Sequence, residues 1–167
     1  MDFSMKRIMF VCHGNICRSP MAEFITKKIV KDLGLAHDYE IVSRATSPEE
    51  YGNDIYPPAA RELSRHGIPY EKRAATLVLS SDYEKYDVFA LMDERNARNI
   101  SRYFKSDPKG KISKLLLFVG ESRDVCDPYY SGDFGSAYSD ILRGCIGLLC
   151  SVDSRITKDK IKALSIY

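Results

Sequence analysis

Short apolar runs alternate with longer amphipathic segments along this chain, and that alternation constrains the fold more than any other feature of the sequence. The apolar runs, which are typical of buried strands, lie at residues 6–11, 40–43, 87–92 and 114–119. Segments with helical spacing or helix start and stop signals lie at residues 19–33, 58–66, 81–86, 94–103 and 134–152. Strands that alternate with helices favour a parallel sheet covered on both faces. The sequence therefore predicts a single three-layer α/β domain over residues 1–167, with a central four-stranded parallel sheet flanked by helices.

The composition argues against several classes of partner. The 167 residues fit one domain, and the formal net charge is only +2, with basic and acidic residues interspersed. This balance gives no reason to expect binding to nucleic acid or to an anionic membrane. No segment approaches the ~18 apolar residues of a membrane span, and no signal-peptide core is evident. We expect a cytoplasmic protein, and a monomer.

The cysteine count bears on the redox state of the chain. Five cysteines are an odd number, which does not indicate a disulfide framework in a chain of this size. We expect Cys126, Cys145 and Cys150 to be buried, reduced thiols.

The stretch "FVCHGNICRSPMAE" at residues 10–23 joins the first predicted strand to the first predicted helix. Ligands of such sheets bind at the carboxyl ends of the strands, so Cys12 stands where a site is expected. Gly14 and Asn15 favour a turn that aims successive backbone N–H groups inward. Ser19 suits an N-cap and Pro20 the first helical position, which turns the positive helix end toward the same hollow. No Asp or Glu occurs from residue 3 to residue 22, so the sequence predicts a phosphate loop after strand 1.

Cys12 and Arg18 would give this loop a nucleophile and a cation. A free thiol has a pKa of about 8.5, but one that faces a helix N-terminus and a guanidinium can fall to roughly 3.5–7.5 and attack as the thiolate. The planar fork of Arg18 can hold two phosphoryl oxygens. The alternative is that Cys12 is an unreactive residue at the end of a buried strand and Arg18 is a solvated charge in the first turn of the helix. The Gly-Asn turn and the Ser-Pro helix start argue against this alternative. Cys12 and Cys17 supply only two ligands without CxxC spacing, so we predict no metal and no cofactor.

The segment "VCHGNICRSPMAE" closely resembles the signature V-C-x-G-N-I-C-R-S-P-x-A-E of the low-molecular-weight protein tyrosine phosphatases. The likeness extends along most of the chain, to "ATS" at 45–47, "RHGIP" at 65–69, "MDERN" at 92–96 and "DPYY" at 127–130. This resemblance implies a metal-independent phosphatase that hydrolyses phosphotyrosine and aryl phosphate monoesters. It also implies phosphotyrosine-containing proteins or peptides as partners, and inorganic phosphate and other oxyanions as inhibitors.

The resemblance assigns roles to particular residues. The phosphoryl group would be bound by the loop residues Cys12, His13, Gly14, Asn15, Ile16, Cys17 and Arg18. Asn15, Ser19 and Ser43 would support the loop, with Ser19 bonded to the departing thiolate. Asp127 would act first as general acid and then as general base. From the residues alone Asp127 and Pro128 form only a common turn, although Pro128 does restrict the backbone of Asp127.

Other assignments concern the rim of the site. Tyr129 and Tyr130 would border the cleft, with Tyr129 as a wall against the substrate ring, or they are ordinary surface aromatics. Glu49, Glu50 and Tyr51 stand where relatives often carry an aromatic residue after "ATS". An acidic rim would favour basic residues around the target phosphotyrosine.

Three further residues have both a structural and a functional interpretation. Cys17 would protect Cys12 by forming a disulfide under oxidation, unless it is structural filler. His13 either faces solvent or adds charge near the phosphate. The chain also reads "KRAA" at 72–75 where relatives often have H-x-A-R, so support of the loop is expected to differ. His66 and Asp93 are expected to cap helices.

Two alternative functions stay open. A thioredoxin-coupled arsenate reductase would share the fold, but it needs resolving cysteines on a mobile segment downstream, and none occurs between Arg18 and Val125. Cys145 and Cys150 lie five residues apart on a predicted helix, about 140° around its axis. A phosphate-binding module without catalysis would not require Cys12, Arg18 and Asp127 together.

Overall fold

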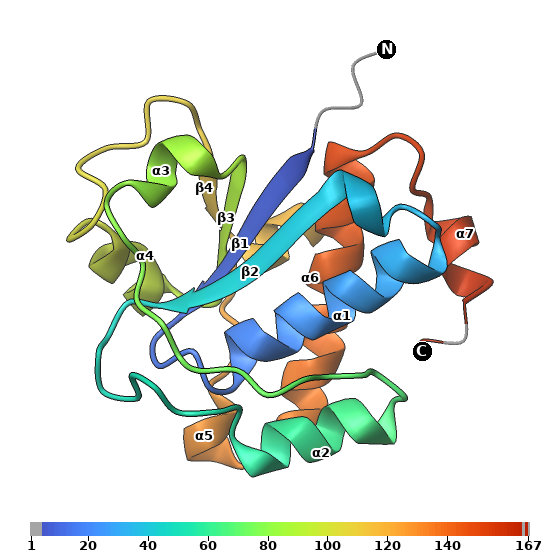
Figure 1. Ribbon diagram of the computed structural model, residues 1–167, viewed down its shortest axis with the longest axis horizontal. Helices are drawn as coiled ribbons and strands as arrows, with labels where there is room; N and C mark the ends of the chain where they lie inside the picture. Colours follow the sequence, from blue (N-terminus) through green and yellow to red (C-terminus); the bar gives the residue numbers. More distant parts are fainter. Residues whose placement is uncertain (1–4, 165, 167) are drawn as a thin grey trace.

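A central parallel sheet organises the computed structural model, which describes residues 5–164 and 166 (Figure 1). Its four strands are β1 (Lys6–Cys12), β2 (Tyr39–Ala45), β3 (Val88–Leu91) and β4 (Ile112–Lys114). They lie in the order β2-β1-β3-β4, and each neighbouring pair is parallel. The predicted four-stranded parallel sheet in a single α/β domain is therefore confirmed.

Helices cover both faces of this sheet. The α-helices are α1 (Arg18–Asp32), α2 (Pro57–Arg65), α3 (Asp82–Lys85), α4 (Glu94–Ile100), α5 (Pro128–Ser131), α6 (Phe134–Val152) and α7 (Lys158–Lys162). Two 3-10 helices, η1 (Ala36–Asp38) and η2 (Leu115–Val119), complete the set found among the described residues. In Figure 1, α1, α2 and α6 lie on one side of the sheet, and α3 and α4 lie on the other.

The alternation of side chains along β1 explains the three layers, because successive residues of a strand point to opposite faces. Ile8 and Phe10 belong to a core cluster with residues of α1, α2 and α6. Met9 and Val11 belong to a second cluster with Tyr83, Phe89 and Phe104. All seven residues of β1 pair with β2, and four of them also pair with β3, so β1 lies inside the sheet. The end of this central strand is thus held from both sides.

The predicted fourth strand at 114–119 is wrong for most of its length. The strand is only Ile112–Lys114, and the apolar run that follows is the 3-10 helix η2. Leu115 and Leu116 are buried against α6 rather than in the ladder. Two glycines of α6 permit this approach: a Cβ at Gly144 would lie 2.5 Å from Leu115 Cγ, and one at Gly147 would lie 2.6 Å from the Phe118 carbonyl oxygen. A short apolar run does not distinguish a strand from a buried helical turn, so the packing against α6 decides.

Other boundaries differ less. The helix predicted at 94–103 ends at Ile100, the one at 81–86 spans Asp82–Lys85, and α5, α7 and η1 were not predicted. No helix within the described part of the chain is long and apolar enough to cross a bilayer. Cys145 is buried as expected, but Cys150 is half-buried and Cys126 is exposed, which corrects the expectation that all three lie inside.

Candidate active site

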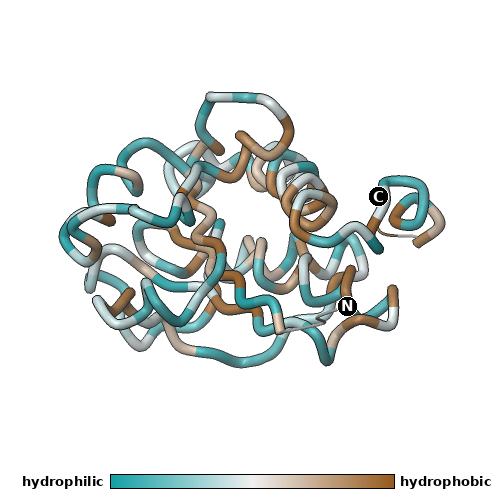
Figure 2. The backbone as a smooth tube through the Cα atoms, turned by 90° about the horizontal axis from the view of Figure 1, so that it is seen from above, coloured by the Kyte–Doolittle hydropathy of each residue, from teal (hydrophilic) through white to brown (hydrophobic). Residues whose placement is uncertain are grey.

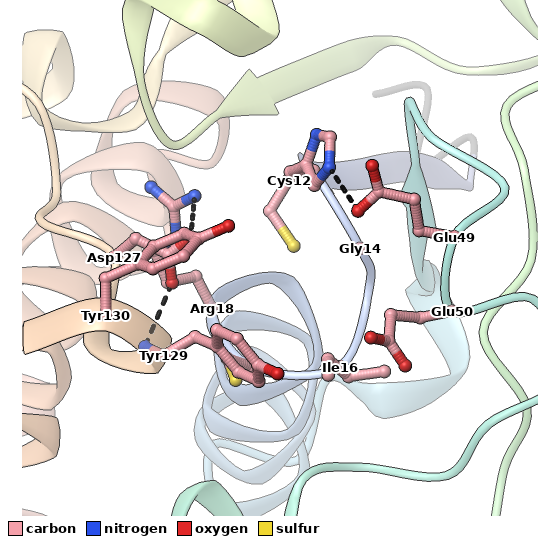
Figure 3. Close-up of a pocket in the computed structure, with 11 residues that line it drawn as sticks. Cys12, Gly14, Ile16, Arg18, Glu49, Glu50, Asp127, Tyr129 and Tyr130 are labelled. Atoms are coloured by element: carbon pink, nitrogen blue, oxygen red, sulfur yellow. Dashed lines mark hydrogen bonds and ion pairs between the residues drawn. The ribbon is translucent and has the colours of Figure 1, made fainter. Parts of the chain in front are cut away.

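A pocket opens at the carboxyl end of the central strand, where the sheet geometry predicts a site (Figure 3). Its lining comes from three segments: the loop after β1, the loop after β2, and the segment that leads into α5. The lining residues are Cys12, His13, Gly14, Ile16, Cys17, Arg18, Glu49, Glu50, Asp127, Tyr129 and Tyr130. Residues far apart in the sequence therefore meet around one hollow.

The loop from Cys12 to Arg18 follows the predicted turn with two differences. Asn15 has a φ of 59°, so it takes the left-handed conformation expected for it. Gly14 does not have a positive φ; its role is space, because a Cβ there would lie 3.2 Å from Glu50 Cγ. The helix α1 begins at Arg18 with Cys17 as N-cap, so Ser19 is not the cap. Pro20 still falls in the first turn, where a missing N–H costs no helical hydrogen bond.

Ser19 does not cap α1, and its side chain faces the Cys12 sulfur instead. The Ser19 Oγ lies 3.0 Å from Cys12 Sγ, and the backbone N–H of Asn15 donates to the same sulfur at 3.3 Å. Cys12 is only 3% exposed, yet Figure 3 shows its sulfur directed into the pocket. The first-turn N–H groups of α1 also lack partners within the helix. Hydrogen-bond donors therefore surround this sulfur.

Asn15 connects the loop to the structure behind it. Its side-chain amide donates to Ser19 Oγ at 2.8 Å and to Ser43 Oγ at 2.9 Å. The Ser43 hydroxyl donates in turn to Glu23 Oε1 at 2.6 Å. The supporting set expected from the resemblance, Asn15, Ser19 and Ser43, therefore lies together beneath the loop.

Arg18 is held rigidly at the far side of the pocket. Its Nη1 donates to Asp93 Oδ2 at 2.7 Å and to the Val125 carbonyl oxygen at 2.8 Å, and its Nη2 lies 3.4 Å from Asp127 Oδ2. The side chain is 2% exposed. Burial alone would lower the pKa of the Arg18 guanidinium, but the charges of Cys12, Asp127 and Asp93 outweigh it and raise the pKa above its ordinary value. A permanent positive charge is thereby fixed opposite the sulfur.

Asp127 connects two parts of the site. As N-cap of α5, it accepts the backbone N–H of Tyr129 through Oδ1 at 3.1 Å, while Oδ2 faces Arg18. Its side chain is about a quarter exposed (27%), so a ligand in the pocket can reach it. The extended backbone of Asp127 before Pro128 agrees with the constraint that a proline places on the preceding residue.

The rim is aromatic on one side and acidic on the other. Tyr129 packs against Tyr56, with ring centroids 5.3 Å apart, and meets the exposed Tyr130 edge to face. Across the pocket, Glu49 Oε2 lies 3.0 Å from His13 Nε2, and the Glu50 carboxylate accepts from Asn53 Nδ2 at 2.7 Å.

Comparison with known proteins identifies the family. The family model for low molecular weight phosphotyrosine protein phosphatases matches residues 7–161. The chain belongs to this family. It is 36% identical to the low molecular weight protein-tyrosine-phosphatase PtpA of Staphylococcus aureus, over 87% of this chain and 92% of that protein.

Solved structures agree with this assignment. The structure of YfkJ from Bacillus subtilis superposes with a TM-score of 0.86 at 33% identity, covering 92% of this chain and 98% of that one. SP-PTP, the low molecular weight protein tyrosine phosphatase of Streptococcus pyogenes, superposes with a TM-score of 0.80 at 32% identity, covering 95% and 98%.

The structure brings together nearly all the residues that the sequence singled out. Tyr51 is the exception among the predicted rim residues, because its exposed side chain does not line the pocket. His66 and Asp93 both lie at helix ends, as expected, and Asp93 forms a capping box with Asn96. Cys17 is buried beside Ile16, and this burial, together with Cys12 and Asp127, raises the pKa of its thiol, which keeps it neutral.

Sequence reasoning missed several supporting residues. The ion pair of Asp93 with Arg18 was not foreseen, although Asp93 follows β3 and thus ends beside β1. Arg73 donates to Asn15 Oδ1 at 2.5 Å. The "KRAA" segment was expected to change the support of the loop, but the sequence did not indicate which side chain makes the contact. Tyr56, which supports Tyr129, lies in a loop whose path only the fold determines.

Proposed function

We propose that this member of the family hydrolyses phosphotyrosine and other aryl phosphate monoesters through a phosphocysteine on Cys12. One observation carries the proposal: the Cys12 sulfur, contacted by Ser19 and the Asn15 N–H, shares a pocket with Arg18 and Asp127. This arrangement supplies a nucleophile, a phosphoryl-binding cation and a proton donor within one hollow.

In the first step the Cys12 thiolate attacks phosphorus, and the bond to the aryl oxygen breaks. Asp93 and Val125 occupy Nη1 of Arg18, and Asp127 Oδ2 lies 3.4 Å from Nη2. Nε and the other N–H of Nη2 would hold phosphoryl oxygens together with the loop N–H groups. A phenolate is a poor leaving group, and protonated Asp127 would give it the proton.

In the second step water attacks the phosphocysteine. Asp127, now ionised, would accept a proton from that water, and inorganic phosphate would leave. The Ser19 hydroxyl would stabilise the thiolate as it departs, because its oxygen lies within 3.0 Å of the sulfur. The same loop would bind inorganic phosphate and related oxyanions as competitive inhibitors.

The oxidoreductase alternative receives no support from Cys145 or Cys17. Cys145 is buried in α6, and burial raises the pKa of its thiol to about 12, so it is neither mobile nor reactive. Cys17 lines the pocket as a free, neutral thiol. Its disulfide with Cys12 under oxidation stays a prediction, as does the cytoplasmic location.

The rim favours a particular substrate class. Glu49 and Glu50 place two carboxylates opposite the aromatic side formed by Tyr129 and Tyr130 (Figure 3). A phosphotyrosine ring would lie against Tyr129, and flanking lysine or arginine residues would face the carboxylates. We therefore propose phosphotyrosine peptides with adjacent basic residues as preferred substrates.

The decisive experiment is a pH–rate profile on an aryl phosphate for the wild type, Asp127→Asn and Cys12→Ser. We expect wild-type activity to peak on the acidic side of neutrality and to fall as the general acid loses its proton. Asp127→Asn keeps an oxygen that can accept the Tyr129 N–H. The kcat of this variant should be lower by about 10²–10³-fold, and its activity should no longer decrease as the pH rises above the optimum. Cys12→Ser should bind phosphate without turnover. Turnover by Cys12→Ser, or an Asp127→Asn profile parallel to the wild type, would refute the mechanism.

A further inference from the structure

Arg73 stands directly behind the phosphate loop in a place that the proposed mechanism does not use. Its side chain is half-buried, and its Nη2 donates to Asn15 Oδ1 at 2.5 Å. Two contacts with a neighbouring segment fix it there: its Nη1 donates to the Asn53 carbonyl oxygen at 3.3 Å, and its backbone N–H donates to Asp54 Oδ1 at 3.2 Å. It lies in the "KRAA" segment at residues 72–75.

The orientation of the Asn15 amide is settled by its partners. Arg73 and the Thr76 backbone N–H are donors only, and both approach Oδ1. The Nδ2 group must then face the hydroxyls of Ser19 and Ser43, to which it donates. All four hydrogen-bonding positions of the amide are therefore filled.

This orientation gives the hydrogen bonds a single direction from Arg73 to the sulfur. Asn15 Nδ2 donates to Ser19 Oγ, so the hydroxyl hydrogen of Ser19 is free to point at Cys12 Sγ, 3.0 Å away. A cation on the oxygen side of an amide strengthens the donation from its nitrogen side, and hydrogen bonds in a chain polarise one another. A Cys12 thiolate can only accept, and the hydrogen bonds then run from Arg73 through Asn15 and Ser19 to Cys12, with every donor directed toward the sulfur.

We propose that Arg73 is a positioning residue that favours the thiolate of Cys12 through Asn15 and Ser19 and holds the loop in its binding conformation. The inference rests on the proposed function only in taking Cys12 as the nucleophile. Burial lowers the pKa of the Arg73 guanidinium from its ordinary value, but an arginine so placed remains charged. Arg18 supplies the positive charge on the pocket side, and Arg73 supplies it from behind.

Other charges also face this region, and the test must hold them constant. They are Arg18, Asp93 and Asp127 on the acid side, His13, Glu49 and Glu50 on the rim, and Glu23, Arg44 and Asp54 behind the loop. None of them is altered when Arg73 alone is changed, so the difference between variants reports the effect of Arg73.

The test measures how fast iodoacetate alkylates Cys12 as a function of pH, with the modified peptide identified by mass spectrometry and no substrate present. Arg73→Met should raise the midpoint of this profile by about half a unit to one unit, so that alkylation below the midpoint slows about three- to tenfold. Arg73→Lys should stay near the wild type because it keeps the charge. Exposed Arg102, outside the pocket lining, provides the matched control Arg102→Met, which should leave the profile unchanged.

A double mutant tests the route. In a Ser19→Ala background, Arg73→Met should shift the midpoint much less than in the wild type. Equal shifts in both backgrounds would show that Arg73 acts directly through space and would overturn the route through Asn15 and Ser19. An Arg73→Met profile identical to the wild type would overturn the whole proposal. If Arg73→Met does not fold, Arg73→Gln against Arg73→Lys decides: a raised midpoint for Gln alone supports the proposal, and equal midpoints overturn it. Failure of the wild type to hydrolyse any aryl phosphate would instead count against the proposed function.

Discussion

The two ends of the sheet both bury an ion pair, but they use it differently. At the amino end, Asp153 is 4% exposed and accepts from Tyr39 Oη at 2.7 Å and from Arg155 Nε and Nη2 at 3.0 and 2.8 Å. At the carboxyl end, Arg18 is 2% exposed and faces two carboxylates, of which Asp127 is held only at 3.4 Å. One carboxylate is saturated with donors, whereas the other is partly open to the pocket.

This difference separates stability from function. The hydrogen bond from Arg155, together with that from Tyr39, holds the pKa of Asp153 far below its usual range, despite burial. A buried charge with complete partners supports the folded state, and removing one partner is costly. Arg18 still has N–H groups that can bind a ligand, because its contact with Asp127 is long. Such an arrangement is expected where a site gives up some stability for activity. We therefore expect substitutions at the two ends to act on different observables.

The largest effect is expected from Arg18→Lys at the carboxyl end. Lysine keeps the charge but loses the planar fork, so kcat/KM on an aryl phosphate should fall by about 10²–10³-fold. The melting temperature should fall by a much smaller proportion than the activity, because lysine keeps a positive charge beside Asp93. Activity assays and thermal unfolding measure the two quantities, and a large loss of stability with near-normal kcat/KM would break the comparison.

Asp153→Asn at the amino end should do the reverse. It should lower the free energy of unfolding at neutral pH by about 1–3 kcal/mol and leave kcat unchanged. Because the folded pKa of Asp153 is depressed, its contribution is present above the ordinary value of about 3.9 and is lost as pH falls. Denaturant titrations at several pH values should show the gap between variant and wild type closing toward low pH.

A matched control for that substitution is Asp159→Asn, at an exposed position in the first turn of α7. It removes the same charge without a buried partner and should change the unfolding free energy by no more than a few tenths of a kcal/mol. A gap for Asp153→Asn that stayed constant with pH would mean that its ion pair does not stabilise the fold.

The smallest effect concerns the rim. Replacing Glu49 and Glu50 with glutamine should reduce the preference for basic over acidic phosphotyrosine peptides by about two- to fivefold, since exposed charges are screened. Turnover of a small aryl phosphate should stay nearly constant. Peptide kinetics at low and high salt measure this preference. A preference that responds to neither the substitutions nor the salt would show that Glu49 and Glu50 do not select the substrate.

Much of this organisation was predictable from local sequence patterns. The sheet, the α1 region and helix Phe134–Val152 follow from periodicity, and the loop from Cys12 to Arg18 follows from its turn residues. The fourth strand was mispredicted because a run such as "LLLFV" fits either a strand or a buried turn until its neighbour is known. The N-cap was misassigned to Ser19 because a Ser-Pro pair is typical of a helix start, whereas α1 already begins at Arg18 and the Ser19 hydroxyl contacts the Cys12 sulfur.

The sequence did not show which side chains of the segments after β3 and around residues 72–75 reach the site, although a difference in loop support was expected at 72–75. Asp93 and Arg73 touch the loop across 75 and 58 positions of the chain, respectively. No periodicity or motif encodes such contacts, because they depend on where the strand ends and loops converge. Tyr51 shows the opposite error: its neighbours in sequence line the pocket, while its own side chain points to solvent.

One carboxyl group joins recognition to chemistry in this protein. Asp127 is fastened through one oxygen to the amide that leads Tyr129 into α5, while its other oxygen faces Arg18. A bound peptide that displaces Tyr129 must therefore also displace Asp127, the proposed proton donor. Ill-fitting peptides would then enter the pocket but react slowly, so discrimination among them would be read in kcat more than in KM.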